Sequence, residues 1–414
     1  MTDDNSNDND NDVLIRQRVR GFLSNPNAKF PYIINSNEIR TLTYLLASTG
    51  ESLDSPESLD GHQKWYWVTD NTVTKLRLFQ YLNPTSNTWR LPPKIGNMIG
   101  LKHLILLKCS SLPPEIAKLE SLKILHLAIC DDQIDLPQVE MPALEVFCIS
   151  SGIWDKKQIT ALLSWLSVYA PKLTTFSIYD LSRDVSKLFI SALLEPDVSG
   201  RVDLVRLDIK NCGLFEVDTE TIIFDLLPLY PGITLLYLSE NEIESLKSIG
   251  ETAMKMKNAI TSQQLKCISL VGNPCFSNLN KTSSSDHIAA ISLLKQFKQL
   301  IWLGHFKKTV RPTTEIEYWT KINRGGRHLV DGYKKVLPEN LWPNILERAY
   351  RTSNGGPYAV KTIAEEDTHD ATAMFYLIRE GPLFSGKHKL SAPRHCSEIL
   401  KNVSKKRKRE NQKN

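Results

Sequence analysis

A short apolar pattern, LxxLxL, recurs through the middle of the chain and restricts its fold more than any other sequence feature. Successive copies begin 21 to 35 residues apart, at Val73, Leu101, Leu122, Leu144, Leu173, Leu204, Ile233, Leu265 and, weakly, Leu300. Such a period is typical of an array in which each unit buries its apolar residues only against its neighbours. We therefore expect an open array of repeats rather than a single closed core.

Each repeat predicts one short strand followed by an inward-facing residue. Alternation places Leu104 and Leu106, for example, on one side of a strand, because successive side chains point to opposite faces of a sheet. Three residues after the last apolar strand position stands an Asn or Cys, namely at Cys109, Cys130, Cys212, Asn241 and Asn273. We expect these side chains to bond turn backbone groups that burial would otherwise leave unpaired. Stacked repeats then form one curved parallel sheet.

Two later segments add helical patterns between the strands. Apolar residues at i, i+3, i+4 and i+7 define one helical face in each of them. In the first segment they are Ile159, Leu162, Leu163 and Leu166. In the second they are Ala290, Leu293, Leu294 and Phe297. The second half of the array is therefore expected to carry helices between its strands.

Taken in phase, segments such as LKHLILLKCSSLPPEIAKLES and LVRLDIKNCGL resemble the leucine-rich repeat family, over about 230 of the 414 residues. The early repeats, with their LPPKI and LPPEI segments, resemble the plant-like class. The later repeats, about 30 residues long, resemble the ribonuclease-inhibitor-like class. The resemblance implies an α/β fold, a leucine-rich-repeat solenoid or horseshoe with a curved parallel sheet inside and helices outside.

The flanking segments divide the chain into five parts. We expect a disordered acidic N-terminus at 1–12, a helical N-terminal cap at 13–70, repeats at 71–306, a helical C-terminal extension at 307–385 and a basic disordered tail at 386–414. Residues 39–78 resemble the cap that precedes many plant-type repeats. Trp67 stands where that cap has glycine and Asp70 where it has cysteine, so its disulfide chemistry is absent. The aromatic cluster Trp65, Tyr66 and Trp67 would close the core, or alternatively stack a ligand.

The strings NRGGR, LWP and FYLIREGP after the repeats resemble the C-terminal segment of uncharacterised leucine-rich-repeat proteins of unicellular algae. This resemblance implies no established activity. Structurally, the block would cover the open end of the array, since a repeat array needs both ends capped.

The basic charge of the chain belongs to its tail. From Gly381 onward ten Lys or Arg stand against two Glu, so residues 1–380 together carry −3 of the total +5. Five consecutive bases resemble a short nuclear-import signal, namely Lys405, Lys406, Arg407, Lys408 and Arg409. The alternatives are a merely solvated basic end and direct contact with phosphate.

The sequence predicts neither catalysis nor a cofactor. It contains no GxxxxGK[ST], HExxH or GxSxG motif, and the NRGGRH glycines read as a turn between helices rather than an anion cradle. Cys148 and Cys267 fall on outward strand positions, and no histidine is expected in their rows. His103 and His126 lie close enough for a two-histidine metal site, but no third ligand accompanies them, so no metal is predicted.

The residues between the apolar strand positions define a surface for a partner. Among them Ile105, Leu107, Ile124 and Val146 are expected to form one exposed apolar patch, unless the cap or a convex segment covers it. The protein-binding candidates on this concave face are Arg77, Phe79, His103, Ile105, Leu107, Ile124, His126, Tyr179 and Tyr237. Few of the outward residues are basic, which argues against nucleic-acid binding by the array itself.

The resulting functional prediction is a non-enzymatic scaffold that binds a protein or peptide on its concave face. The alternative is a nuclear factor that contacts nucleic acid through its basic tail. An intracellular location, in nucleus or cytoplasm, is expected because the N-terminus has no apolar signal segment and the cysteines show no disulfide pattern. No membrane association is predicted, and the oligomeric state stays open.

Overall fold

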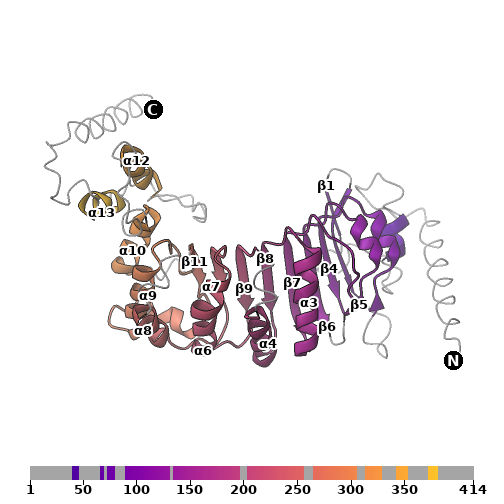
Figure 1. The fold of residues 1–414 in the computed structure, drawn as a ribbon, viewed down its shortest axis with the longest axis horizontal. Helices are drawn as coiled ribbons and strands as arrows, with labels where there is room; N and C mark the ends of the chain where they lie inside the picture. Colours follow the sequence, from indigo (N-terminus) through magenta and orange to yellow (C-terminus); the bar gives the residue numbers. More distant parts are fainter. Residues whose placement is uncertain are drawn as a thin grey trace, which may run out of the picture. The chain divides into compact units, whose positions relative to one another are not determined.

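The computed structural model describes residues 40–45, 66–69, 72–79, 89–130, 134–195, 203–255, 264–304, 313–328, 342–352 and 372–380. The chain divides into two compact units, one ending at Thr313 and the other beginning at Thr314 (Figure 1). In the described part of the chain, all strands belong to the first unit, and the second unit is helical.

Nine of the described strands form one sheet, in the order β1-β2-β4-β6-β7-β8-β9-β10-β11. Eight of these run parallel, and β1 pairs antiparallel with β2. A small second sheet joins β3 to β5. The strands are β1 (Tyr66–Thr69), β2 (Thr72–Phe79), β3 (Trp89–Arg90), β4 (His103–Leu107), β5 (Cys109–Ser111), β6 (Ile124–Cys130), β7 (Val146–Gly152), β8 (Thr175–Tyr179), β9 (Arg206–Lys210), β10 (Leu235–Tyr237) and β11 (Cys267–Ser269). The expected α/β fold with a mostly parallel sheet is confirmed.

The register brings equivalent apolar residues of successive repeats side by side. One row comprises Leu76, Leu104, Leu125, Phe147, Phe176, Leu207, Leu236 and Ile268. A second row comprises Leu78, Leu106, Leu127, Ile149, Ile178 and Ile209. All of these side chains are buried, so the period-two pattern has its expected origin in a continuous core. The weak repeat at Leu300 contributes an isolated bridge between Cys267 and Trp302.

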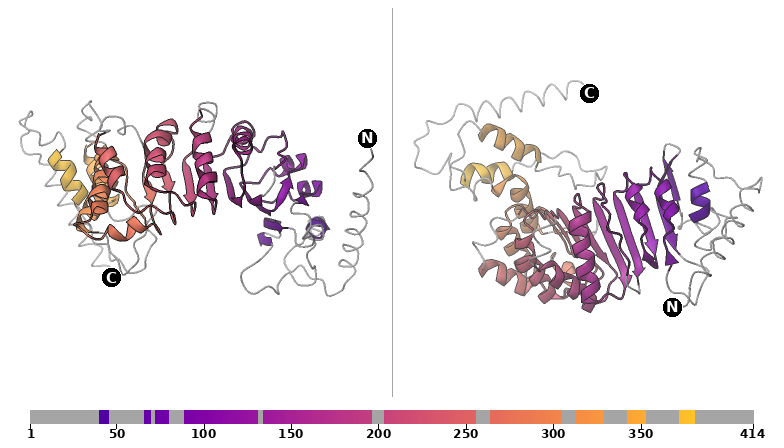
Figure 2. Two further views of the ribbon diagram at one scale, coloured as in Figure 1. Left: turned by 90° about the horizontal axis from the view of Figure 1, so that it is seen from below. Right: turned by 45° about the vertical axis from the view of Figure 1, so that its right-hand side comes forward.

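Helices connect the later strands and pack on one side of the sheet (Figure 2). Trp165 lies 6.4 Å from Phe147 and Phe189 lies 6.1 Å from Phe176, ring centre to ring centre, so helices α3 and α4 cover the inward rows. The α-helices of this unit are α3 (Lys156–Tyr169), α4 (Arg183–Leu193), α6 (Glu216–Glu220), α7 (Leu227–Leu229), α8 (Lys247–Lys255) and α9 (Ser285–Gln296). Residues 40–45 are also helical. The apolar helical faces predicted in α3 and at 290–297 are buried.

Short helices of other types complete the connections. The LPPKI and LPPEI segments form the 3₁₀ turns η1 (Pro93–Asn97) and η2 (Pro114–Lys118), and η5 (Pro274–Asn278) is similar. Between α6 and α7 the chain forms a π-helix, η3 (Thr221–Leu226). Pro228 follows it, and this residue lacks the N–H that a continuous α-helix would use.

The segment predicted as a helical cap also contains a strand. Within 13–70, the described residues are helical at 40–45 but extended in β1. Its sequence, YWVT, consists of aromatic and β-branched residues, which favour a strand at a free sheet edge. A strand therefore lies within the segment expected to form the helical cap. Trp65 and Asp70, together with the acidic N-terminus and the basic tail, lie outside the described residues.

The turn at the end of β4, β7, β8, β9, β10 and β11 repeats in detail. Residues at equivalent positions adopt a left-handed conformation, with φ of 57° at Lys108, 50° at Ser151, 54° at Asp180, 51° at Asn211, 58° at Glu240 and 83° at Gly272. Four of their amides donate to a carbonyl of the next repeat: Lys108 to Ala128, Asp180 to Lys210, Asn211 to Ser239 and Glu240 to Val271. The neighbouring repeat therefore holds this conformation, which costs energy for residues other than glycine.

Asn241 shows why an inward amide follows the turn. Its Oδ1 accepts from the amides of Cys212 and Leu214 at 2.9 and 3.2 Å. Its Nδ2 donates to the carbonyls of Ile209, at 2.8 Å, and Leu238, at 3.0 Å. One side chain thus satisfies four backbone groups across two repeats, as predicted for this position.

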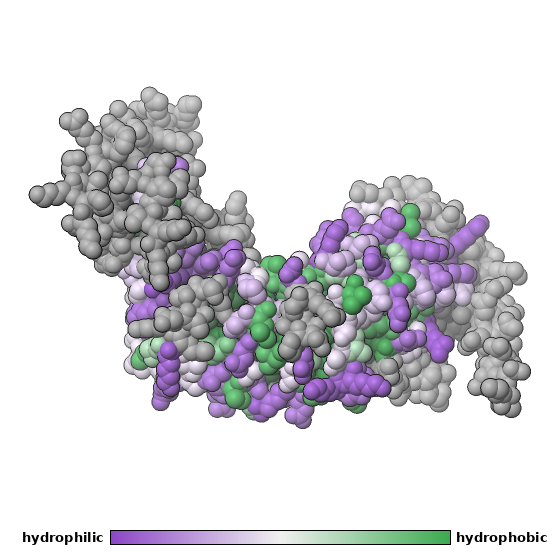
Figure 3. All heavy atoms as spheres, in the orientation of Figure 1, coloured by the Kyte–Doolittle hydropathy of each residue, from purple (hydrophilic) through white to green (hydrophobic). Residues whose placement is uncertain are grey.

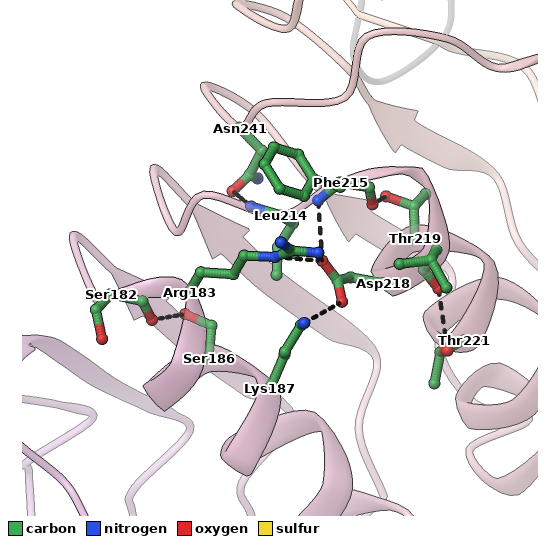
Figure 4. A network of polar contacts seen from close by, with 11 residues as sticks. Ser182, Arg183, Ser186, Lys187, Leu214, Phe215, Asp218, Thr219, Thr221 and Asn241 are labelled. Carbon is green, nitrogen blue, oxygen red and sulfur yellow. Dashed lines mark hydrogen bonds and ion pairs between the residues drawn. The ribbon is translucent and has the colours of Figure 1, made fainter.

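A charged cluster joins α4 to the next repeat (Figure 4). The buried carboxylate of Asp218 accepts from Arg183 Nε at 3.1 Å and from the amide of Phe215 at 3.0 Å, and Lys187 Nζ lies 3.7 Å away. The Arg183 guanidinium lies 3.8 Å from the centre of the Phe215 ring. These partners are structural: they fasten adjacent repeats on the helix side of the sheet.

The second unit contains α10 (Thr314–Arg324), α12 (Trp342–Thr352) and α13 (Thr372–Glu380). Its core includes Trp342, Leu346, Ala349, Ala373 and Leu377. The glycine pair of NRGGRH follows α10 as a turn, as predicted, and a Cβ on Gly325 would overlap the Cβ of Ala373.

Candidate functional site

The strand residues that point away from the helices form a surface that we call the outward face. Its first row is Lys75, His103, Ile124, Val146, Thr175, Arg206, Leu235 and Cys267. Its middle row is Arg77, Ile105, His126, Cys148, Ser177, Asp208, Tyr237 and Ser269. Its third row is Phe79, Leu107, Ala128, Ser150, Tyr179 and Lys210. All nine protein-binding candidates occupy positions in these rows. The side chain of Phe79 lies outside the described residues.

The apolar patch is less accessible than its sequence pattern suggested. Ile105, Leu107, Ile124 and Val146 are half-buried rather than exposed. Neighbouring strands lie only about 4.8 Å apart, so adjacent side chains on one face shade each other. More exposed large apolar side chains occur elsewhere, as at Val168 and Ile288. On the side drawn in Figure 3, hydrophobic and hydrophilic residues are interspersed.

Arg77 lies half-buried in the middle row, in register with Ile105. Its Nε atom is buried and has no hydrogen-bond partner within the described part of the chain. Its charge helps to lower the pKa of His126, which is two strands away in the same row. Arg77 therefore brings a positive charge to the first strands of the outward face.

Both histidines of this face are neutral at pH 7. Burial, with help from Lys75 and His126, lowers the pKa of His103 to about 4. Burial and the charge of Arg77 lower the pKa of His126 to about 4, although Asp180 opposes this shift. Nε2 of His126 lies 2.8 Å from the Ser150 hydroxyl. These rings act as polar, uncharged surface groups at neutral pH.

The register contradicts one expectation about the cysteines. His126 pairs with Cys148 across β6 and β7, so a histidine does share the row of an outward cysteine. Burial raises the pKa of Cys148 to about 11, while the pKa of His126 falls. These shifts disfavour the thiolate–imidazolium pair that nucleophilic catalysis needs. The described residues also contain no cluster of three metal-ligating side chains.

A polar hollow of about 380 Å³ opens over β8, β9 and β10. Its lining residues are Tyr179, Asp180, Arg206, Asp208, Lys210, Tyr237 and Ser239. Asp208 lies at its base, with a side chain that is 3% exposed. Its Oδ2 accepts from Ser177 at 3.0 Å and from Tyr179 at 3.1 Å, while Arg206 binds both oxygens through Nε, at 2.8 and 3.0 Å.

The Asp208 carboxylate balances the positive charge of Arg206. Burial alone would lower the pKa of Arg206, but the hydrogen bonds and charge of Asp208 raise it overall. The guanidinium also lies 4.4 Å from the centre of the Tyr237 ring. Burial and the Asp208 charge raise the pKa of Tyr179, so this phenol stays protonated. The hollow is consequently a fixed, hydrogen-bonded surface.

Sequence reasoning singled out only Tyr179 and Tyr237 of this hollow. Arg206, Asp208 and Lys210 were expected on outward strand positions but were not among the binding candidates. The signal for them is the segment RLDIK, in which charged residues of both signs alternate with buried Leu207 and Ile209. The candidate nuclear-import residues, 405–409, lie outside the described part of the chain.

Neither protein-family models nor curated protein sequences match this chain. No helix in the described ranges is both long enough and apolar enough to span a bilayer.

Proposed function

We propose that this chain is an intracellular leucine-rich-repeat protein whose outward face binds a protein or peptide partner. The proposal rests on the outward side chains that parallel strands align in three rows. They include half-buried aliphatic residues on β4, β6 and β7 and polar residues on β8, β9 and β10. The repeated strand, left-handed turn and inward Asn support the family assignment, including the plant-like early and ribonuclease-inhibitor-like later repeats.

Rigidity favours binding at this face. The strands β2, β4, β6, β7, β8, β9 and β10 each have a paired strand on both sides, and Arg206 and Tyr179 are held by Asp208. Fixed aromatic and Arg side chains lose little conformational freedom on association, and they are common energetic anchors of protein interfaces. A half-exposed apolar surface beside such anchors suits a partner chain better than a small metabolite.

The proposed role is non-enzymatic and needs no cofactor. The best-placed nucleophile and base, Cys148 and His126, have pKa values shifted in the directions that oppose their reaction. Nuclear entry through residues 405–409, and contact with nucleic acid there, form the alternative. That alternative rests on the sequence of the tail alone.

Affinity capture with the full chain tests the proposal. The bait variants are wild type, Ile105→Asp/Ile124→Asp on the outward face, and Val168→Asp, a matched apolar-to-acid change at an exposed site on α3. Circular dichroism checks their folding, and mass spectrometry identifies the retained proteins. We expect at least one partner retained by wild type and Val168→Asp but lost from the double variant. Identical partners for all three baits would overturn the proposal.

A further inference from the structure

We propose that strands β2, β4 and β6 bind an acidic, apolar peptide segment whose carboxylate pairs with Arg77 while its aliphatic side chains pack on Ile105, Leu107 and Ile124. This inference rests on the proposed function and names the chemistry of the partner. It concerns the first strands of the outward face, not the hollow over β8–β10.

Among the described residues, Arg77 has a hydrogen-bond donor that is not satisfied. Its Nε is buried without a hydrogen-bond partner in the described ranges, and no described carboxylate pairs with its guanidinium. A partly buried cation without a partner is costly, because desolvation is not compensated. A planar guanidinium binds a carboxylate through two parallel hydrogen bonds, so an acidic side chain is the group that this site lacks.

The charged residues on the first strands of the outward face are complementary to an acidic segment. The strands β2, β4, β6 and β7 contain Lys75 and Arg77 but no Asp or Glu. His103 and His126 are neutral at pH 7, so they neither add to this positive charge nor oppose a carboxylate. Among the groups facing His126, Asp180 on the β8 side supplies the acidic charge. The described strands on the β2 side of the outward face therefore contain no carboxylate that would oppose an acidic segment approaching Arg77.

Arg206 provides an internal comparison. It occupies the first row of the same face, but Nε and Nη2 donate to Asp208 at 2.8 Å. The described part of the chain thus supplies a carboxylate for Arg206 but no acceptor for Nε of Arg77. A carboxylate from a partner would give Arg77 the contact that Asp208 gives Arg206.

The apolar neighbours of Arg77 define the rest of the segment. Ile105 pairs with Arg77 across β2 and β4. Leu107 lies two residues further along β4, in the third row, and Ile124 lies on β6, in the first row. Adjacent strands lie about 4.8 Å apart, and two residues of an extended segment span about 6.6 Å. An acidic residue and an aliphatic residue separated by two or three positions would reach both contacts. The aliphatic surroundings favour such a peptide over a phosphodiester chain, which would require a basic stripe.

A library of random twelve-residue peptides displayed on phage tests the inference with the full chain as bait. We expect the selected peptides to be enriched in Asp or Glu beside Leu, Ile, Val or Phe. Fluorescence anisotropy then measures affinities of one selected peptide for wild type, Arg77→Gln, Arg77→Lys and Lys118→Gln. Lys118 is exposed on η2, so its substitution makes the same change of charge away from the face.

Arg77→Gln should weaken binding roughly ten- to a hundred-fold, which is the range for losing a hydrogen bond to a charged group. Arg77→Lys should retain part of the affinity, and Lys118→Gln should bind like wild type. A matched peptide with Gln for each acid should bind wild type and Arg77→Gln equally weakly.

The outcomes separate this inference from the proposed function. If selected peptides lose binding to Ile124→Asp but show no acidic enrichment, or ignore Arg77→Gln, the outward face binds peptides and the inference about Arg77 is wrong. If a twelve-residue oligothymidylate displaces the peptide and itself depends on Arg77, a nucleic acid replaces the proposed peptide and the inference is overturned. If no peptide depends on Ile124, both proposals fail.

Discussion

Adjacent residues of β6 should respond in opposite ways to the same substitution. Ile124 lies on the outward face and is half-buried, whereas Leu125 lies in the inward row between Leu104 and Phe147 and is 0% exposed. We expect Ile124→Asp to leave the array folded and to abolish partner binding. We expect Leu125→Asp to unfold the array.

The burial of each side chain sets the size of the effect. Removing the buried leucine costs about 2–5 kcal/mol, and an unpaired buried carboxylate costs several more. Such a loss is comparable with a total stability of about 5–15 kcal/mol. Ile124 gives up about half of an apolar burial worth about 2 kcal/mol, and a carboxylate introduced at this position would keep its contact with water. The expected cost of Ile124→Asp is therefore about 1 kcal/mol.

Urea unfolding followed by circular dichroism measures the difference. Ile124→Asp should lower the transition midpoint slightly with an unchanged slope, and Leu125→Asp should show no cooperative transition. A cooperatively folded Leu125→Asp protein would refute the assignment of inward and outward rows. A collapse of Ile124→Asp would refute it equally, because it would place Ile124 in the core.

Three further outcomes can be measured. Asn241→Ala leaves two buried amides without their acceptor and should destabilise the chain by about 2–4 kcal/mol in urea unfolding. Asn273→Ala should cost less, because among the contacts described Oδ1 of Asn273 accepts only from the Ile243 amide. The pKa values of His103 and His126 are lowered in the folded state, so the unfolded state binds more protons between pH 6.5 and about 4. The unfolding free energy should therefore fall as the pH falls through that window. Substituting both histidines by Gln should reduce this fall, and an unchanged pH dependence would contradict the pKa shifts. Fusing residues 404–414 to a fluorescent reporter should concentrate it in the nucleus, and a Gln-substituted run at 405–409 should not; equal distribution of the two would remove the import hypothesis.

Local alternation accounts for what the sequence could predict. LxxLxL fixes which residues of a strand face the core, because a one-residue slip would expose every leucine. The inward rows and the Asn positions therefore follow from the spacing alone. The helix α3 also follows, because Ile159 and Leu166 share a face over two turns.

Contacts between repeats account for what the sequence could not predict. Asp208 is buried because Ser177 and Tyr179, about 30 residues earlier, reach it from the preceding strand. The half-burial of Ile105 and Ile124 depends on shading by neighbouring strands, which hydropathy does not report. Strand β1 was missed because its four residues are too few to show a period.

The left-handed turn position holds six residues of six different types, from Lys108 to Gly272. A left-handed residue other than glycine costs about 1–2 kcal/mol, and glycine itself loses about 0.5–1 kcal/mol of chain entropy on folding. Glycine at Lys108 or Ser151 would therefore release roughly 0.5 kcal/mol at each site. Glycine substitutions at these turn positions would thus raise the stability of the chain one repeat at a time. The outward-face residues proposed to contact the partner would stay unchanged.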